Sequence, residues 1–234
     1  LELGGNKLSL DFASVNNATF ILPNTLAMDT AGSVIETRGS NLTLADALQL
    51  NFGSITSTGG TLSFAGGLTL APYGELDVSG STLSAGQVLD LSYGTFSSSN
   101  ASILRLQSAT TLSSSNPVSF GSVNFEGQIL TLGSASTELN LTDANTALSL
   151  SGIALETGAG SLTLSGALAL SNSAALNSSG GTITLGSGAS APSGTSISLP
   201  NTTLVLENDL SITGGTLKTN GTTFTTNANA LTLS

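Results

Sequence analysis

The stretch Thr61-Leu-Ser-Phe-Ala-Gly-Gly-Leu-Thr-Leu70 is followed by two stretches of the same pattern, Thr82-Leu-Ser-Ala-Gly-Gln-Val-Leu-Asp-Leu91 and Ile103-Leu-Arg-Leu-Gln-Ser-Ala-Thr-Thr-Leu112. The second position is leucine in all three stretches. Three columns share one spacing: Leu62/Leu83/Leu104, Phe64/Ala85/Leu106 and Leu70/Leu91/Leu112. Several columns with a common period of about 21 residues indicate a repeat architecture.

The same period continues on both sides of these stretches. Upstream, Leu42, Leu44 and Leu50 extend the columns at nearly the same spacing, and Phe20 and Leu22 lie one such step before Leu42 and Leu44. Downstream, the columns are Leu162/Ile183/Leu204, Leu164/Leu185/Leu206 and Leu155/Leu176/Ile197. We therefore expect residues 1–234 to form one domain, with regular coils at 42–112 and 148–212. Residues 113–147, whose apolar positions are out of register, are predicted to be an irregular coil or loop.

Within each repeat, apolar and polar residues alternate over short runs that end at glycine pairs such as Gly59-Gly60 and Gly180-Gly181. Alternation with period 2 predicts strands with one buried face, and glycine allows the positive φ of tight turns. A β-sandwich would explain the strand spacing, but it would not explain columns that repeat at one fixed period. We therefore predict an all-β fold, a parallel β-solenoid (β-helix) with coils of about 21 residues.

The charge content argues against several classes of partner. Only 8% of the residues are charged, against about 25% in an average globular protein, and the net charge is −10. The four cations, Lys7, Arg38, Arg105 and Lys218, are scattered along the chain. They cannot neutralise a phosphate backbone, so we expect no nucleic-acid partner. No apolar run reaches the length of a transmembrane helix, so we expect no membrane span.

The chain lacks His, Cys and Trp, which leaves no Ser-His-Asp, Cys-His or histidine-metal site. Two carboxylate pairs, Glu75 with Asp77 and Glu207 with Asp209, are separated by a single residue each, so each pair is predicted to share one strand face. Neither pair has a Lys or Arg one coil away, so we interpret both as solvated side chains and expect no enzyme. Glu207 and Asp209 are also a candidate for a single calcium ion, and no other cofactor is expected.

Polar residues facing away from the core form a second periodic pattern. Serine and threonine repeat at the coil period in Thr61/Ser63, Thr82/Ser84, Ser161/Thr163 and Thr182/Thr184. Flat rows of Thr-x-Thr are the physical basis of ice binding by some β-solenoids, so these eight residues are candidates for a ligand surface. The competing interpretation is that Ser and Thr are ordinary solvent-facing strand residues.

The segments Ser161-Leu-Thr-Leu-Ser-Gly-Ala-Leu-Ala-Leu170 and Gly181-Thr-Ile-Thr-Leu185 resemble the repeats of bacterial autotransporter passengers and filamentous-haemagglutinin-like adhesins. The resemblance extends over nearly the whole chain, but it is one of composition and repeat texture. It implies a right-handed parallel β-helix that is exported to the bacterial cell surface or the extracellular space. It implies no active-site residue.

From these observations we expect a non-enzymatic structural or adhesive segment of a larger surface or matrix protein. Residues 230–234, Ala-Leu-Thr-Leu-Ser, look like a further coil, so the expected partners are neighbouring coils of the same chain or a second copy associated end to end. A surface glycan or matrix is an expected external partner. The alternatives are an ice-binding solenoid and a polysaccharide-active β-helix enzyme.

Overall fold

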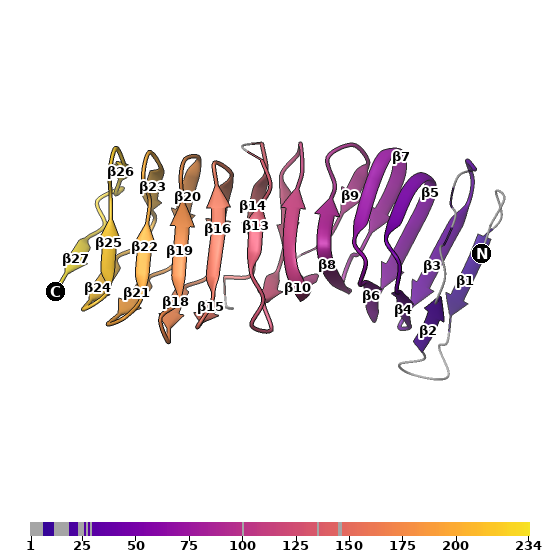
Figure 1. The fold of residues 1–234 in the computed structure, drawn as a ribbon, viewed down its shortest axis with the longest axis horizontal. Coiled ribbons are helices and arrows are strands. Elements are labelled where there is room, and N and C mark those ends of the chain that lie inside the picture. Colours follow the sequence, from indigo (N-terminus) through magenta and orange to yellow (C-terminus); the bar gives the residue numbers. More distant parts are fainter. Residues whose placement is uncertain are drawn as a thin grey trace.

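The computed structural model describes residues 7–11, 19–22, 26, 28, 30–99, 101–134, 136–144 and 147–234. These residues form strands β1 to β27 and no helix, and the strands pair in parallel. The strands stack into a rod of about 10 turns (Figure 1). At about 4.8 Å per coil, the rod is roughly 50 Å long. The predicted all-β parallel solenoid is confirmed.

From β4 onward, each coil contributes one strand or half-strand to each of three faces, which we call face A, face B and face C. Face A contains β2 (Thr19–Leu22), β4 (Asn41–Leu44), β6 (Thr61–Phe64), the first halves of β8 (Thr82–Asp90) and β10 (Ile103–Ser113), β12 (Ser122–Asn124), β15 (Leu148–Ser151), β18 (Leu168–Ser171), β21 (Ala189–Pro192), β24 (Leu210–Thr213) and β27 (Leu231–Leu233). Face B contains the first halves of β5 (Leu48–Thr58) and β7 (Leu68–Asp77), the second halves of β8 and β10, β13 (Leu130–Leu132), β16 (Ala154–Gly158), β19 (Ala175–Ser178), β22 (Ser196–Ser198) and β25 (Thr216–Lys218). Face C contains β1 (Lys7–Asp11), β3 (Val34–Arg38), the second halves of β5 and β7, β9 (Thr95–Ser97), β11 (Val118–Phe120), β14 (Glu138–Leu141), β17 (Ser161–Leu164), β20 (Thr182–Leu185), β23 (Thr203–Leu206) and β26 (Thr223–Thr225).

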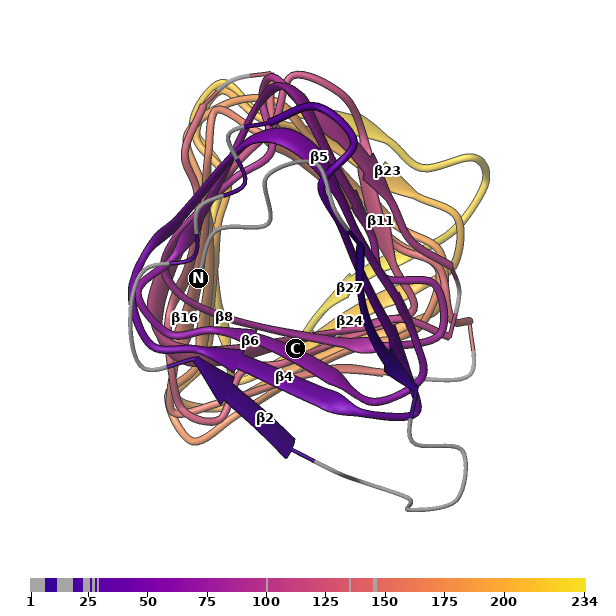
Figure 2. The same ribbon diagram turned by 90° about the vertical axis from the view of Figure 1, so that its right-hand side faces the viewer.

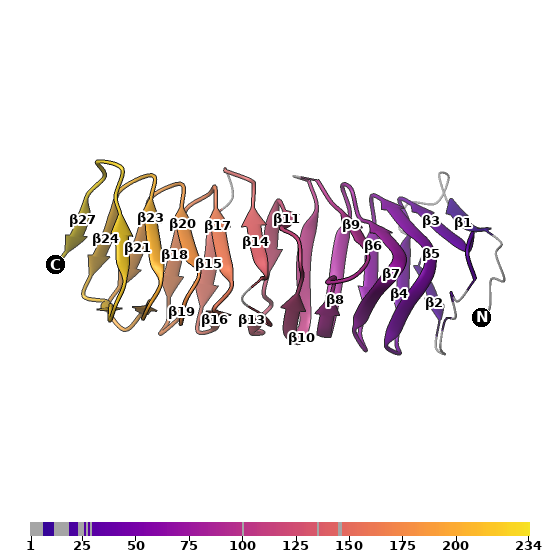
Figure 3. The same cartoon turned by 90° about the horizontal axis from the view of Figure 1, so that it is seen from above.

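The cross-section of the rod is a rounded triangle (Figure 2). Figure 2 looks along the rod from its N-terminal end, with β4 and β6 of face A at the bottom, β16 of face B on the left and β11 and β23 of face C on the right. The chain visits the faces in the order A, B, C and recedes from the viewer, so the coil is right-handed. In Figure 3, the strands β14, β17, β20 and β23 of face C follow one another along the rod.

The leucine columns form the core. Leu42, Leu62, Leu83 and Leu104 are paired in register on face A, and each is completely buried. The three downstream columns also pair as predicted. Like side chains therefore stack on like at the strand spacing, which buries an aliphatic core inside a thin rod.

One predicted column is wrong at its last step. Leu112 pairs with Leu89 and not with Leu91, because the register shifts between Leu106 and Thr110 of β10. The corner between faces A and B holds more residues in β10 than in β8, where Ala85 and Gln87 are the corresponding paired residues. Such a bulge leaves the hydrophobic alternation intact but displaces the count along the sequence.

Residues 113–147, predicted to be irregular, supply β11 to β14 to the stack. Two ladders are interrupted there: β9 does not pair with β11, and β12 does not pair with β15. The core continues across the first interruption, because the rings of Phe96 and Phe120 lie 5.5 Å apart. The rod therefore stays continuous where its regular repeat is disturbed.

Buried hydroxyl groups of successive coils pair with one another at the corners. Thr37 Oγ1 donates to Ser57 Oγ at 2.8 Å, and Ser57 Oγ lies 2.9 Å from Ser81 Oγ in the next coil. In the later coils, Thr202 Oγ1 donates to Ser178 Oγ at 3.0 Å. These side chains pair with one another from coil to coil, so the serine and threonine at these corners do not carry the cost of unpaired buried polar groups.

Candidate functional site

The structure places the eight predicted hydroxyl residues on two different faces. Thr61, Ser63, Thr82 and Ser84 lie on face A, in β6 and β8, whereas Ser161, Thr163, Thr182 and Thr184 lie on face C, in β17 and β20. The two groups therefore do not form one surface.

The face A group does not present an open row of hydroxyls. Ser63 and Ser84 are buried, with exposed fractions of 6% and 0%. Gln107, which lies two coils away from Ser63, donates its Nε2–H to Ser63 Oγ at 2.6 Å. Gln107 and Ser63 line a groove on face A, and Arg105 lines it as well. Ser84 Oγ has no hydrogen-bond partner in the described part of the chain. The long polar side chains of Arg105 and Gln107 therefore interrupt the serine and threonine rows on this part of face A.

The face C group is half-exposed and is extended by the next coils. Ser161 and Thr163 of β17 precede Thr182 and Thr184 of β20, which pair with Thr203 and Val205 of β23. Thr203 and Val205 then pair with Thr223 and Thr225 of β26. Four successive coils therefore carry two columns of hydroxyl residues, in which Val205 is the one exception.

The first carboxylate pair shares one strand face, as predicted, and that strand half lies on face C. Glu75 and Asp77 both point away from the core in β7, and Leu76 between them is buried. Asp77 Oδ1 accepts hydrogen bonds from the backbone N–H and the hydroxyl of Ser79, at 2.9 and 2.6 Å. Asp77 therefore closes the turn after β7, which is an ordinary structural task for aspartate.

The second carboxylate pair does not share a strand face, so that prediction is wrong. Glu207 and Asp209 lie in the exposed corner between β23 and β24. Asp209 Oδ1 accepts the backbone N–H of Ala230 at 2.8 Å and so ties this corner to the next coil. Among the described residues, no cluster of three or more potential metal-ligating side chains occurs.

Arg105 forms a two-pronged ion pair with Glu126, one coil further along the rod. Its Nε donates to Glu126 Oε1 at 2.7 Å and its Nη2 donates to Oε2 at 3.0 Å. These hydrogen bonds lower the pKa of the Glu126 carboxyl and raise the pKa of the Arg105 guanidinium, while burial opposes both shifts and their mutual attraction adds to them. Both side chains are exposed, so solvent screens the pair.

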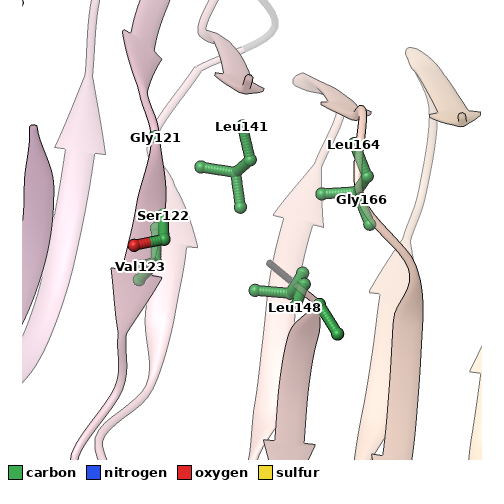
Figure 4. Close-up of a pocket in the computed structure, with 8 residues that line it drawn as sticks. Gly121, Ser122, Val123, Leu141, Leu148, Leu164 and Gly166 are labelled. Atoms are coloured by element: carbon green, nitrogen blue, oxygen red, sulfur yellow. The ribbon is translucent and has the colours of Figure 1, made fainter. Parts of the chain in front are cut away.

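A narrow cleft lies at the interruption between β12 and β15 (Figure 4). Val123 and Leu148 lie on its two sides, and Leu141 and Leu164 also line it. The space open to the centre of a water molecule is only about 10 Å³. That volume holds about one water, so we interpret the cleft as imperfect packing where the ladder stops.

An exposed aromatic column runs along the corner between faces B and C. The rings of Phe52 and Tyr73 are stacked with centroids 5.2 Å apart and planes 3° from parallel. Tyr93 follows one coil later, and both tyrosines are about two-thirds exposed, at 68% and 67%. In an average soluble protein such large rings are mostly covered, so two exposed tyrosines beside the half-buried Phe52 mark a candidate binding site.

A slot of about 400 Å³ opens beside Phe52. The preceding coil lines it with Ala31, Gly32, Ser33 and Val34, and the coils of the aromatic column line it with Phe52, Gly53, Ser54, Tyr73 and Glu75. The volume is in the range of small-molecule pockets. The slot combines one aromatic ring stack, two serines and one carboxylate.

Our sequence reasoning missed this site, although a signal was present. Each ring is followed by glycine and the spacing is close to the coil period, in Phe52-Gly53, Tyr73-Gly74 and Tyr93-Gly94. The glycines are needed because neighbouring backbone passes close by. A Cβ on Gly53 would lie 2.1 Å from the Ser33 carbonyl oxygen, and one on Gly74 would lie 2.2 Å from that of Leu50.

No protein-family model matches the chain, and no curated protein or solved structure is significantly similar to it. In the part of the chain that the structure describes, no helix is long and apolar enough to cross a bilayer.

Proposed function

We propose that the chain is a non-enzymatic rod segment of a larger extracellular protein, with a structural or adhesive role at a bacterial cell surface. The observation that carries this proposal is the continuous stack of coils, which holds a thin rod around one aliphatic core. A solenoid of this kind separates its two ends by a fixed distance and offers three long faces for contacts. The repeats' resemblance to adhesin passengers supports the same role.

The partners we propose are further coils of the same chain or a second copy. In the described part of the chain, β25, β26 and β27 each pair on one side only, as do β1 and β2 at the other end. The unpaired N–H and C=O groups of such edges are templates for another strand. Stacking of another coil would satisfy them with the geometry that the rod already uses.

The test of self-association is the mass of the purified chain as a function of concentration. We expect the weight-average mass in sedimentation equilibrium to rise with concentration. Leu233→Lys, at an exposed position in the terminal strand β27, should suppress the rise, because an edge lysine opposes strand addition. Val88→Lys, at an exposed position in mid-rod, is the control and should leave the rise unchanged. A chain that stays monomeric at the highest soluble concentration would contradict the second-copy proposal.

Ice binding by face C is the second candidate, because the threonine columns of β17, β20, β23 and β26 are regular and half-exposed. If the face binds ice, Thr184→Tyr should abolish most of the thermal hysteresis, since a ring in the centre of a flat surface prevents close contact. Ser190→Tyr on face A, also at an outward-facing strand position, is the matched control. Absence of thermal hysteresis and of ice-crystal shaping in the unsubstituted chain would end this candidate.

We do not propose the polysaccharide-active enzyme. Asp77 Oδ1 already accepts two hydrogen bonds from Ser79, and no Lys or Arg lies one coil away from Glu75 or Asp77 in the sequence. Calcium at Glu207 and Asp209 stays a prediction, to which the bond between Asp209 and Ala230 lends no support.

A further inference from the structure

We propose that the slot beside Phe52 binds a sugar ring of a neutral glycan chain, and that the aromatic column is the adhesive site of the rod. This inference rests on the adhesive role proposed above and gives that role a place and a ligand class. It does not depend on self-association, because the slot lies on the side of the rod and not at an end.

The slot has the shape of a missing place in the ring stack. Phe52 and Tyr73 extend a stack of rings along the rod, but the stack stops at the preceding coil, where Gly32 lines the slot without a side chain. The space left there is about 400 Å³ and is bounded by the Phe52 ring on one side. A flat ring of about the thickness of the strand spacing can therefore take the next place in the stack.

The lining of the slot has the chemistry that a sugar ring needs. A pyranose ring has an apolar C–H face and a rim of hydroxyl groups. Phe52 supplies an apolar ring for such a face, with Tyr73 stacked behind it, and the Glu75 carboxylate and the Ser54 hydroxyl can accept hydrogen bonds from the rim. A pocket that is mostly apolar with a few polar groups is the usual composition of a small-molecule site.

The charge of the slot is negative. Glu75 is the only charged residue among the described residues that line the slot, and the chain as a whole carries a net charge of −10. A uronic acid, a sialic acid or a phosphate group would meet a carboxylate with no cation in the lining beside it. Charge therefore favours a neutral sugar over an anionic one.

The slot opens into a longer groove along the rod. A second groove, of about 190 Å³, shares Ser54 and Glu75 with the slot and continues over Asp77 and Thr95 of the following coils. Tyr93 lies at the corner beside Thr95, one coil beyond Tyr73. The site therefore continues from the slot along the rod, which fits several linked sugar residues better than a single one.

The sequence provides a direct probe of binding. Tyr73 and Tyr93 are the only tyrosines and the chain has no tryptophan, so the intrinsic fluorescence reports on the aromatic column itself. We would titrate the full chain with cellohexaose and with xylohexaose, and with hexa-galacturonic acid as the anionic comparator. We expect a saturable change in tyrosine fluorescence with at least one neutral hexasaccharide, and binding at least about tenfold weaker for the acidic one.

Three variants locate the site. Phe52→Ala removes the ring beside the slot, and Ala31→Phe fills the slot from an exposed position, so both should weaken binding about tenfold or more. Ala31→Phe keeps the test valid if Phe52→Ala unfolds. Phe224→Ala, at a partly exposed phenylalanine in β26, is the matched control and should bind normally.

Two results would overturn the proposal. One is the absence of a saturable change with either neutral hexasaccharide up to millimolar concentration. The other is equal binding by the unsubstituted chain and by Ala31→Phe. Failure here leaves the sedimentation test of rod assembly unaffected, because that test measures mass and its variants lie outside the slot.

Discussion

Phe64→Ala is expected to lower the free energy of unfolding by about 3–5 kcal/mol, as is usual for a fully buried phenylalanine. Phe64 is completely buried on face A, where it pairs with Leu44 of the preceding coil and Ala85 of the next. The small Ala85 leaves room for the large ring of Phe64. Removing this ring creates a cavity in the narrow interior, and the two neighbouring coils cannot fill it without moving their backbones. Urea denaturation followed by far-UV circular dichroism measures the loss.

The control for this prediction is Phe224→Ala, which removes the same side chain from a position that is 39% exposed. We expect a cost below about 1 kcal/mol there, because the ring is only partly removed from water in the folded chain. If Phe64→Ala and Phe224→Ala lowered the free energy of unfolding equally, the Phe64 ring would not be part of a tightly packed core. Since each coil packs mainly on the two coils beside it, the loss can also show as local opening, which pulse proteolysis in the absence of urea would detect.

The stacked core was predictable because burial is periodic at two levels. Alternation gives strands, and columns such as Leu62, Leu83 and Leu104 give the coil. The prediction failed where the coil changes length. Extra residues in the corner of β10 bring Leu112 opposite Leu89, and a corner insertion leaves no mark in the apolar pattern on either side of it.

The separation of the hydroxyl groups onto two faces was also within reach of the sequence. Successive steps of one coil period from Thr82 pass over Ser161 and arrive at Gly166, so Thr82 and Ser161 cannot occupy the same position of the coil unless the coils between them change length. The burial of Ser63 was not predictable, because it depends on Gln107 reaching over two coils. Long-range side-chain contacts of this kind follow from the strand register, which the sequence alone does not contain.

The aromatic column was not predicted from the sequence, for a different reason. Phe52, Tyr73 and Tyr93 occupy corners, so they lie outside the apolar alternation that predicts the strands. In a solenoid, corners stack as regularly as strands, so a side chain repeated at the corner forms a ladder just as a core leucine does. The glycine after each ring is part of the same pattern, and its role can be tested directly.

Gly74→Ala is expected to lower the free energy of unfolding by at least about 2 kcal/mol and to displace Tyr73 from its stack on Phe52. A Cβ at this position would lie 2.2 Å from the Leu50 carbonyl oxygen and 3.0 Å from Leu50 Cγ, so the backbone of one coil would have to move away from the other. Such a shift stretches the ladder between β5 and β7 just where Phe52 pairs with Tyr73. Urea denaturation measures the stability, and the tyrosine emission reports the change around Tyr73.

Gly80→Ala separates this close approach from the cost of glycine's backbone freedom. Gly80 has a φ of +70°, but nothing lies within 4 Å of a Cβ placed on it. Its replacement should therefore cost only the strain of a left-handed alanine, about 1–2 kcal/mol, and should leave the tyrosine emission unchanged. If Gly80→Ala were as damaging as Gly74→Ala, or if Gly74→Ala left the emission unchanged, the corner glycines would be ordinary turn residues. If Gly74→Ala is the more damaging substitution and also changes the tyrosine emission, the contact between successive coils at this corner holds the Phe52–Tyr73 stack, and with it the slot, in place.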